Sequence, residues 1–187
     1  NNNIKKAVLT RDAIPLSSVD ASYMIDSVTG FIKLNKFTTE TYREFMLSLE
    51  ALNKAGMKNL VLDLRDNGGG ILEEAIEIAD EFLDGDKLIT YTEGKHVTKK
   101  EYRCRRVGQF EKGPLIILAD EGTASASEVL IGALQDWDRA TIIGRRTFGK
   151  GLVQEQFELS DHSALRLTIA RYFTPVGRSI QRSYANG

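Results

Sequence analysis

The residues whose types and spacing best suit chemistry lie in Gly122-Thr123-Ala124-Ser125-Ala126-Ser127-Glu128. The apolar run 114–119 precedes this segment and predicts a short buried strand. Apolar residues then recur at helical spacing as far as Trp137, so Ser125 is expected at the beginning of a helix. Unpaired N–H groups and partial positive charge at such a site can stabilise an oxyanion, and a hydroxyl there is a candidate nucleophile.

The same residues also have a structural interpretation. Ser125 and Glu128 match the Ser-x-x-Glu pattern of a capping box, which serves only to begin a helix. The segment alone does not separate a helix cap from a nucleophile.

A second unusual loop contains Gly68-Gly69-Gly70, between an expected strand at 59–64 and an expected helix at 71–83. Consecutive glycines let the backbone approach a ligand and turn its N–H groups outward. The loop matches neither the phosphate-binding nor the dinucleotide-binding glycine pattern. A tight turn without a ligand is the alternative.

A serine nucleophile needs a base. His96 and His162 lie among polar, turn-forming residues and are interpreted as solvated. Lys150 lies between two glycines, just before an apolar run. A lysine has an ordinary pKa of about 10.4 and must be desolvated to act as a base near neutrality. If Lys150 opens the next strand, then Leu152 and Gln154 lie on its face, and Gln154 can orient the amine.

Regular elements must bring these loops together. β-structure is expected over 4–35, in runs at 4–10, 21–25 and 31–34, followed by a helix from Thr38 or Thr39 to Ala55. Further strands are expected at 87–91, 97–103, 140–143, 152–157 and 164–170, with a turn at Asp161-His162. Strand and helix alternate between 59 and 143, which predicts an α/β fold with parallel βαβ units. Both unusual loops would then open at the same edge of the sheet.

Length and composition set the broad class. The 187 residues suit one soluble domain. The net charge of −1 gives no electrostatic reason to expect binding to nucleic acid or to an anionic membrane. The chain shows no signal peptide and begins with Asn1, so it resembles an excised piece. The single cysteine, Cys104, excludes an internal disulfide and a Cys-x-x-Cys metal pair, and is interpreted as a structural thiol.

Several segments together resemble the carboxyl-terminal processing peptidases, or tail-specific proteases. They are 63–70, 122–128, 147–154, 161–167 and 170–177, in the order found in that family. The 25-residue spacing between Ser125 and Lys150 also matches the family. The resemblance implies a ClpP/crotonase-like core of stacked ββα units around a central sheet, with flanking β-structure. It further implies Ser125 as nucleophile, Lys150 as general base and Gln154 as the residue that orients the lysine.

The resemblance also implies an oxyanion hole formed by the N–H of Ala126 and that of Gly70 or Gly69. Ser127 is the rival nucleophile, but two positions further along a helix it would face away from Ser125, so we interpret it as structural.

We therefore expect residues 1–187 to form a single peptidase catalytic domain without the PDZ domain of family members. The expected activity is that of a serine endopeptidase that cleaves protein substrates near their C-termini. The resemblance implies no cofactor and no metal. It implies protein or peptide partners, no nucleic acid, and a place in the cell envelope, periplasm or elsewhere outside the cytoplasm. A homo-oligomer is compatible with the sequence.

Two alternatives remain open at this point. The fold also resembles non-catalytic modules that bind retinoids or lipids, although such a binder has no need of Ser125 with Lys150. A crotonase-like acyl-CoA enzyme would also stabilise an oxyanion with backbone N–H groups, but the sequence shows no feature for binding adenine.

Overall fold

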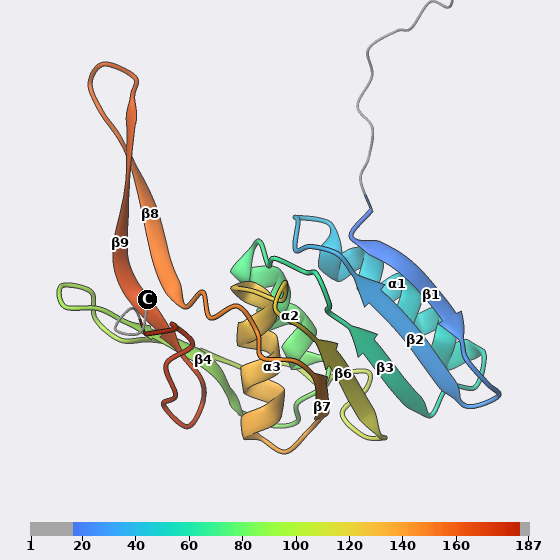
Figure 1. Cartoon of the computed structure of the whole chain (residues 1–187). Helices are drawn as coiled ribbons and strands as arrows, with labels where there is room; N and C mark the ends of the chain where they lie inside the picture. Colours follow the sequence, from blue (N-terminus) through green and yellow to red (C-terminus); the bar gives the residue numbers. More distant parts are fainter. Residues whose placement is uncertain (1–16, 184–187) are drawn as a thin grey trace, which may run out of the picture.

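The computed structural model describes residues 17–183, which form two β-sheets and three helices (Figure 1). The central sheet has the order β1-β2-β3-β6-β7, with β1 antiparallel to β2 and the other neighbours parallel. The second sheet is antiparallel, with the order β5-β4-β9-β8. The predicted α/β fold with parallel strands is therefore confirmed.

The bounds of the elements follow the predicted ones closely. The central strands are β1 (Val19–Met24), β2 (Thr29–Leu34), β3 (Asn59–Asp63), β6 (Leu115–Ala119) and β7 (Thr141–Gly144). The second sheet contains β4 (Leu88–Glu93), β5 (Lys100–Arg103), β8 (Leu152–Glu158) and β9 (Ala164–Phe173). The helices are α1 (Thr41–Lys54), α2 (Leu72–Asp80) and α3 (Ala126–Asp136). The strand expected at 4–10 lies outside the described residues.

One predicted helix is too long. α2 ends at Asp80, whereas the sequence pattern predicts a helix to Leu83. The backbone N–H of Phe82 bonds to the carbonyl of Ala79, three positions back, so the last turn tightens and leaves the α-helical path. Phe82 and Leu83 are buried all the same, because this turn directs them into the core.

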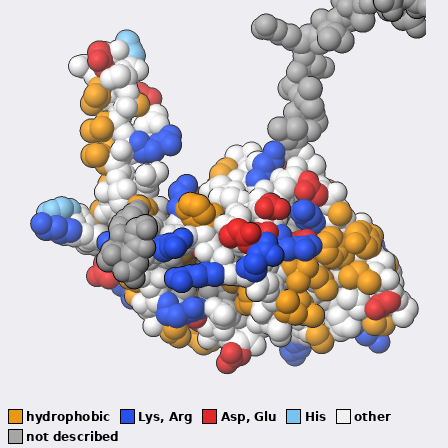
Figure 2. Space-filling model, in the orientation of Figure 1, with side chains coloured by type: hydrophobic (Ala, Val, Ile, Leu, Met, Phe, Trp, Pro, Cys, Tyr) orange, Lys and Arg blue, Asp and Glu red, His pale blue; other side chains and the backbone are white. Residues whose placement is uncertain are grey.

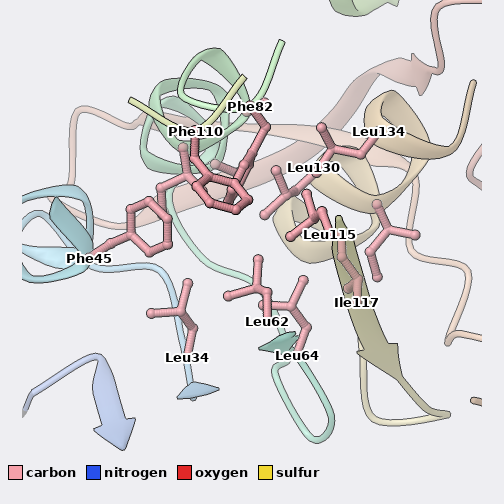
Figure 3. Packing of buried hydrophobic residues seen from close by; sticks show 14 of the residues in the cluster. Leu34, Phe45, Leu62, Leu64, Phe82, Phe110, Leu115, Ile117, Leu130 and Leu134 are labelled. Atoms are coloured by element: carbon pink, nitrogen blue, oxygen red, sulfur yellow. The ribbon is translucent and has the colours of Figure 1, made fainter. Parts of the chain in front are cut away.

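The hydrophobic core joins the central sheet to the helices (Figure 3). Leu62 of β3 and Ile117 of β6 are fully buried on the face of the sheet that the helices cover, whereas their neighbours Val61 and Ile116 are only partly buried. Leu130 and Leu134 of α3 pack into the same cluster. α2 and α3 lie side by side, and both contact β4 of the second sheet (Figure 1). The core thus fixes α3, and with it Ser125, against the central sheet.

The β8–β9 hairpin projects from the rest of the molecule (Figure 1), and its predicted turn at Asp161-His162 is confirmed. Hydrophobic side chains are visible along it (Figure 2). Four of them are among the exposed large hydrophobic residues of the structure: Phe157, Leu159, Leu165 and Leu167. No helix within residues 17–183 has the length and apolar character needed to cross a bilayer.

Candidate active site

Ser125 occupies an unusual backbone conformation at the beginning of α3. It is the N-cap residue, with φ of 58° and ψ of −116°. A non-glycine residue at positive φ costs about 1–3 kcal/mol and persists only where the surrounding structure imposes it. The expected position of Ser125 at a helix N-terminus is confirmed. The strained residue lies at the end of the turn that connects β6 to α3.

The triple-glycine loop lies directly against Ser125. A methyl group added at Gly69 would stand 2.8 Å from Cβ of Ser125, 2.8 Å from the nitrogen of Ala126 and 2.5 Å from the carbonyl oxygen of Ala124. Gly69 also has φ of 88°, which other residues rarely adopt. The sequence expectation that the two loops meet at one edge of the sheet is confirmed.

Asn67 connects the two loops. Its carbonyl oxygen accepts hydrogen bonds from the N–H of Ala124 (2.9 Å) and the hydroxyl of Ser127 (3.1 Å). Its side chain accepts from the N–H of Gly69 (2.9 Å) and donates to the carbonyl of Leu34 (3.0 Å). Asn67 and Ser127 are both fully buried. This arrangement supports the structural interpretation of Ser127.

Three backbone N–H groups where the glycine loop meets the start of α3 have no acceptor within residues 17–183. They belong to Ala126, the first residue of α3, and to Gly68 and Gly70. Gly70 pairs with Phe37 in a parallel bridge through the neighbouring Gly69 carbonyl and Ile71 N–H, so its own N–H is not used. The N–H of Gly69, in contrast, is occupied by Asn67. Of the two glycines that the sequence left open, Gly70 has the free donor.

Glu128 connects helix α3 to the loop 147–151, which carries Lys150 and is called the lysine loop below. Its Oε2 accepts the N–H of Ser125 at 2.9 Å and the N–H of Lys150 at 2.8 Å, and its Oε1 accepts the N–H of Gly149 at 2.7 Å. Glu128 is only 5% exposed. The N–H of Phe148 adds a bond to the carbonyl of Thr123 (3.0 Å). The glutamate of the capping box thus also fixes the backbone of the loop that carries Lys150.

The side chains of Lys150 and Gln154 differ from the sequence expectation. Lys150 lies before β8, which begins at Leu152, and it is exposed rather than desolvated. The pairing register shifts between Val153 and Gln154 because β9 contains an extra residue there: Val153 pairs with Ala170 and Gln154 with Thr168. Gln154 is exposed as well. The condition for a shared strand face, that Lys150 opens the strand, is therefore not met, because β8 begins two residues later.

Two buried carboxylates hold the starts of the loops. Burial raises the pKa of Asp63, but hydrogen bonds from Arg65 outweigh it and hold that pKa below its usual range. Burial likewise acts against ionised Asp120. Hydrogen bonds from the N–H groups of Asp66 and Gly122 and from the Thr123 hydroxyl nevertheless keep its pKa low. Each loop therefore leaves its strand around a charged, hydrogen-bonded anchor.

The other candidate groups lie outside this junction. His96 and His162 are exposed, in agreement with their interpretation as solvated turn residues. Cys104 is buried, and burial, followed by the nearby Asp80 carboxylate, raises the pKa of its thiol to about 12. These surroundings fit a structural thiol.

Sequence reasoning did not find the roles of Asn67 and Glu128. A polar residue within a glycine loop and a capping-box glutamate both have common local explanations. The capping pattern identified Glu128 as a residue that turns toward Ser125, but the bonds to Gly149 and Lys150 span 21 and 22 positions. No local pattern contains that information.

A family model described as "Peptidase family S41" matches residues 28–185. The carboxyl-terminal-processing protease of Synechocystis sp. is 41% identical over 178 residues, covering 93% of this chain and 41% of that protein. The carboxy-terminal processing protease CtpA of Bacillus subtilis is 36% identical, over 93% of this chain and 37% of that protein. This chain therefore spans less than half the length of these two relatives.

A solved structure of a C-terminal processing protease also resembles this chain. The photosystem II D1 C-terminal processing protease superposes with a TM-score of 0.81 at 33% sequence identity, over 92% of this chain and 47% of that one. A Bacteroides fragilis protein whose structure is described as that of an S41 protease shares the fold, with a TM-score of 0.72 at 18% identity, over 89% of this chain and 49% of that one.

Proposed function

The chain belongs to peptidase family S41, and on that premise we propose that it carries the catalytic machinery of a serine peptidase, with Ser125 as nucleophile and Lys150 as general base. The observation that carries the proposal is the junction itself. Ser125 stands at a strained N-cap beside the glycine loop, and one Glu128 oxygen holds both the Ser125 and the Lys150 backbone.

The chemistry proceeds in two stages. The neutral amine of Lys150 takes the proton from Oγ of Ser125 while that oxygen attacks the carbonyl carbon of the scissile peptide. The tetrahedral intermediate then collapses, its C–N bond breaks, and the lysine ammonium gives the proton to the leaving amine. Water, activated by the same lysine, hydrolyses the acyl-enzyme and releases Ser125.

The oxyanion of each tetrahedral intermediate needs donors. The N–H groups of Ala126 and Gly70 fit this role, because neither is used within the described residues and both lie next to Ser125 or to Gly69, which contacts it. One such donor contributes about 10²–10³ in rate. Gly69 supports the proposal differently, by letting the loop approach the serine.

Lys150 acts as a base only in its neutral form. Its side chain is exposed in the free chain, so we propose that bound substrate covers it and excludes water, which favours the neutral amine. Gln154, on the adjoining strand, is proposed to orient the amine once the substrate is in place.

The substrate class rests on the relatives. Proteins that resemble this chain over more than nine-tenths of its length are named as proteases of carboxyl-terminal processing. We propose that this protein likewise cleaves protein substrates near their C-termini, that residues 1–187 belong to one catalytic domain, and that it works outside the cytoplasm. The alternative of a non-catalytic lipid-binding or retinoid-binding module is not favoured, because those relatives are named as enzymes.

The test uses the full-length protein and an unstructured protein substrate, with mass spectrometry of the products. Ser125→Ala and Lys150→Ala should each abolish cleavage while the melting temperature stays near that of the wild type. Ser127→Ala is the matched control, and it should retain cleavage within a few-fold because, among the described residues, the Ser127 hydroxyl bonds only to the Asn67 carbonyl. Turnover in either of the first two variants would exclude the proposed dyad.

A further inference from the structure

The backbone around Lys150 is held from two sides. On the helix side, the carboxylate of Glu128 accepts the N–H groups of Gly149 and Lys150. This contact fixes the beginning of the lysine loop relative to Ser125. It does not reach Gly151, the residue that follows the lysine.

A separate segment, Ile180–Arg182, holds the other side. The N–H of Arg182 donates to the carbonyl of Gly149 at 2.9 Å, and the N–H of Gly151 donates to Oε1 of Gln181 at 3.0 Å. The carbonyl of Gly151 accepts the N–H of Tyr172 from β9 at 2.8 Å. The two glycines that flank Lys150 are therefore bonded to residues 21 to 33 positions further along the chain.

The two glycines also make this approach sterically possible. A methyl group at Gly149 would stand 2.7 Å from Cβ of Arg182, and one at Gly151 would overlap the backbone of Gln181. The segment 180–182 thus lies in direct contact with the loop on either side of the lysine.

Hydrogen bonds rather than core packing hold the lysine loop at this point. A cavity of about 300 Å³ borders it, lined by Phe148, Gly149, Gln181 and Arg182 among others. Phe148, the largest side chain of the loop, is 58% exposed. Because the largest side chain of the loop contributes little packing, loss of the hydrogen bond at Gly151 should let the C-terminal side of Lys150 shift while the other bonds hold the rest of the loop.

We propose that Gln181 is a positioning residue for Lys150. Its amide oxygen is the acceptor for the N–H of Gly151, and its amide nitrogen donates to the carbonyl of Arg182 at 3.0 Å, which keeps the side chain in place. Gln181 thereby fixes the C-terminal flank of Lys150 as Glu128 fixes the N-terminal flank. This inference rests on the proposed function of Lys150 as the base.

The test compares substitutions of Gln181 in the full-length protein. Gln181→Leu keeps the size of the side chain but removes the acceptor. The resulting displacement of the lysine should lower kcat on the order of tenfold to a hundredfold, with KM and melting temperature unchanged. Gln181→Glu keeps an oxygen for the N–H of Gly151 and should retain kcat within about threefold. Gln156→Leu is the matched control, because within residues 17–183 the Gln156 side chain accepts a single bond, from exposed Arg166.

Gln181→Ser, which is too short to reach Gly151, provides a second variant if the leucine variant does not fold, and should show the same fall in kcat. An unchanged kcat in Gln181→Leu or Gln181→Ser overturns the inference, as does an equal loss in Gln181→Glu. Failure of the proposed function is separate, since it requires that Ser125→Ala or Lys150→Ala retain cleavage.

Discussion

Ser125 and Lys150 donate their backbone N–H groups to the same atom, Oε2 of Glu128, at 2.9 and 2.8 Å. A carboxylate that is 5% exposed and accepts three N–H groups is a strong, directional connection. The proposed nucleophile and the proposed base therefore share one fixed reference point, although 25 residues separate them.

Glu128→Gln should reduce both activity and stability. An amide offers one acceptor oxygen and one NH₂ donor, so at least one of the N–H groups of Ser125, Gly149 and Lys150 would face a donor. The unsatisfied group costs about 1–3 kcal/mol, and the free energy of unfolding should fall by that amount. Chemical denaturation and kcat measure the two effects. Glu121→Gln, which among the described residues breaks an exposed ion pair with Arg145, should change neither stability nor kcat. If the two variants had the same stability and the same kcat, the hydrogen bonds of Glu128 would have no role in either.

Gly69→Ala should inactivate the proposed site. The added methyl group would collide with the backbone of Ala124 and Ala126, and the residue would be held at φ of 88°. Displacement of an oxyanion donor costs about 10²-fold or more in kcat. The neighbouring Gly68→Ala provides the control, because no atom of the part of the chain that the structure describes lies within 4 Å of its added methyl group. Equal activity of the two variants would rule out the close approach as a requirement.

Asp120 should make part of the stability depend on acid pH. The pKa of Asp120 in the folded protein lies below the ordinary value of 3.8. Its contribution to the free energy of unfolding is therefore complete above pH 3.8 and is lost as the pH falls through the pKa of the folded state. Asp120→Asn should lower the melting temperature at pH 7 and flatten its decline below about pH 4. Melting curves between pH 2 and pH 7 provide the measurement. Asp138→Asn, at an exposed turn, should follow the wild-type curve; a parallel decline in Asp120→Asn would contradict the prediction.

Cys104 should be inert in the folded protein. Burial and the Asp80 carboxylate disfavour the thiolate and raise its pKa to about 12. We expect no alkylation by iodoacetamide at pH 8 until denaturant is added, and no loss of peptidase activity under those conditions. Mass spectrometry of the labelled chain detects the adduct. Rapid labelling of the native protein would show that the thiol is accessible.

Local sequence patterns predicted most of the fold and the position of the candidate site. The apolar runs at β3 and β6, each followed by small residues and a helical repeat, identified parallel strands and the two loops at their ends. Hydrophobic periodicity is a local property, and the carboxyl ends of parallel strands meet at one edge, so the meeting of Ser125 with the glycine loop could be expected.

Only the tertiary structure decided how the groups at this edge are arranged. It uses the N–H of Gly69 for Asn67 and leaves that of Gly70 free, imposes a positive φ on Ser125, and starts β8 after Lys150, whose side chain stays exposed. The connections made by Glu128 and Gln181 to the lysine loop span 21 to 30 positions. Hydrogen bonds between residues so far apart depend on how the helix, loop and second sheet pack together, and no residue pattern along the chain encodes their geometry.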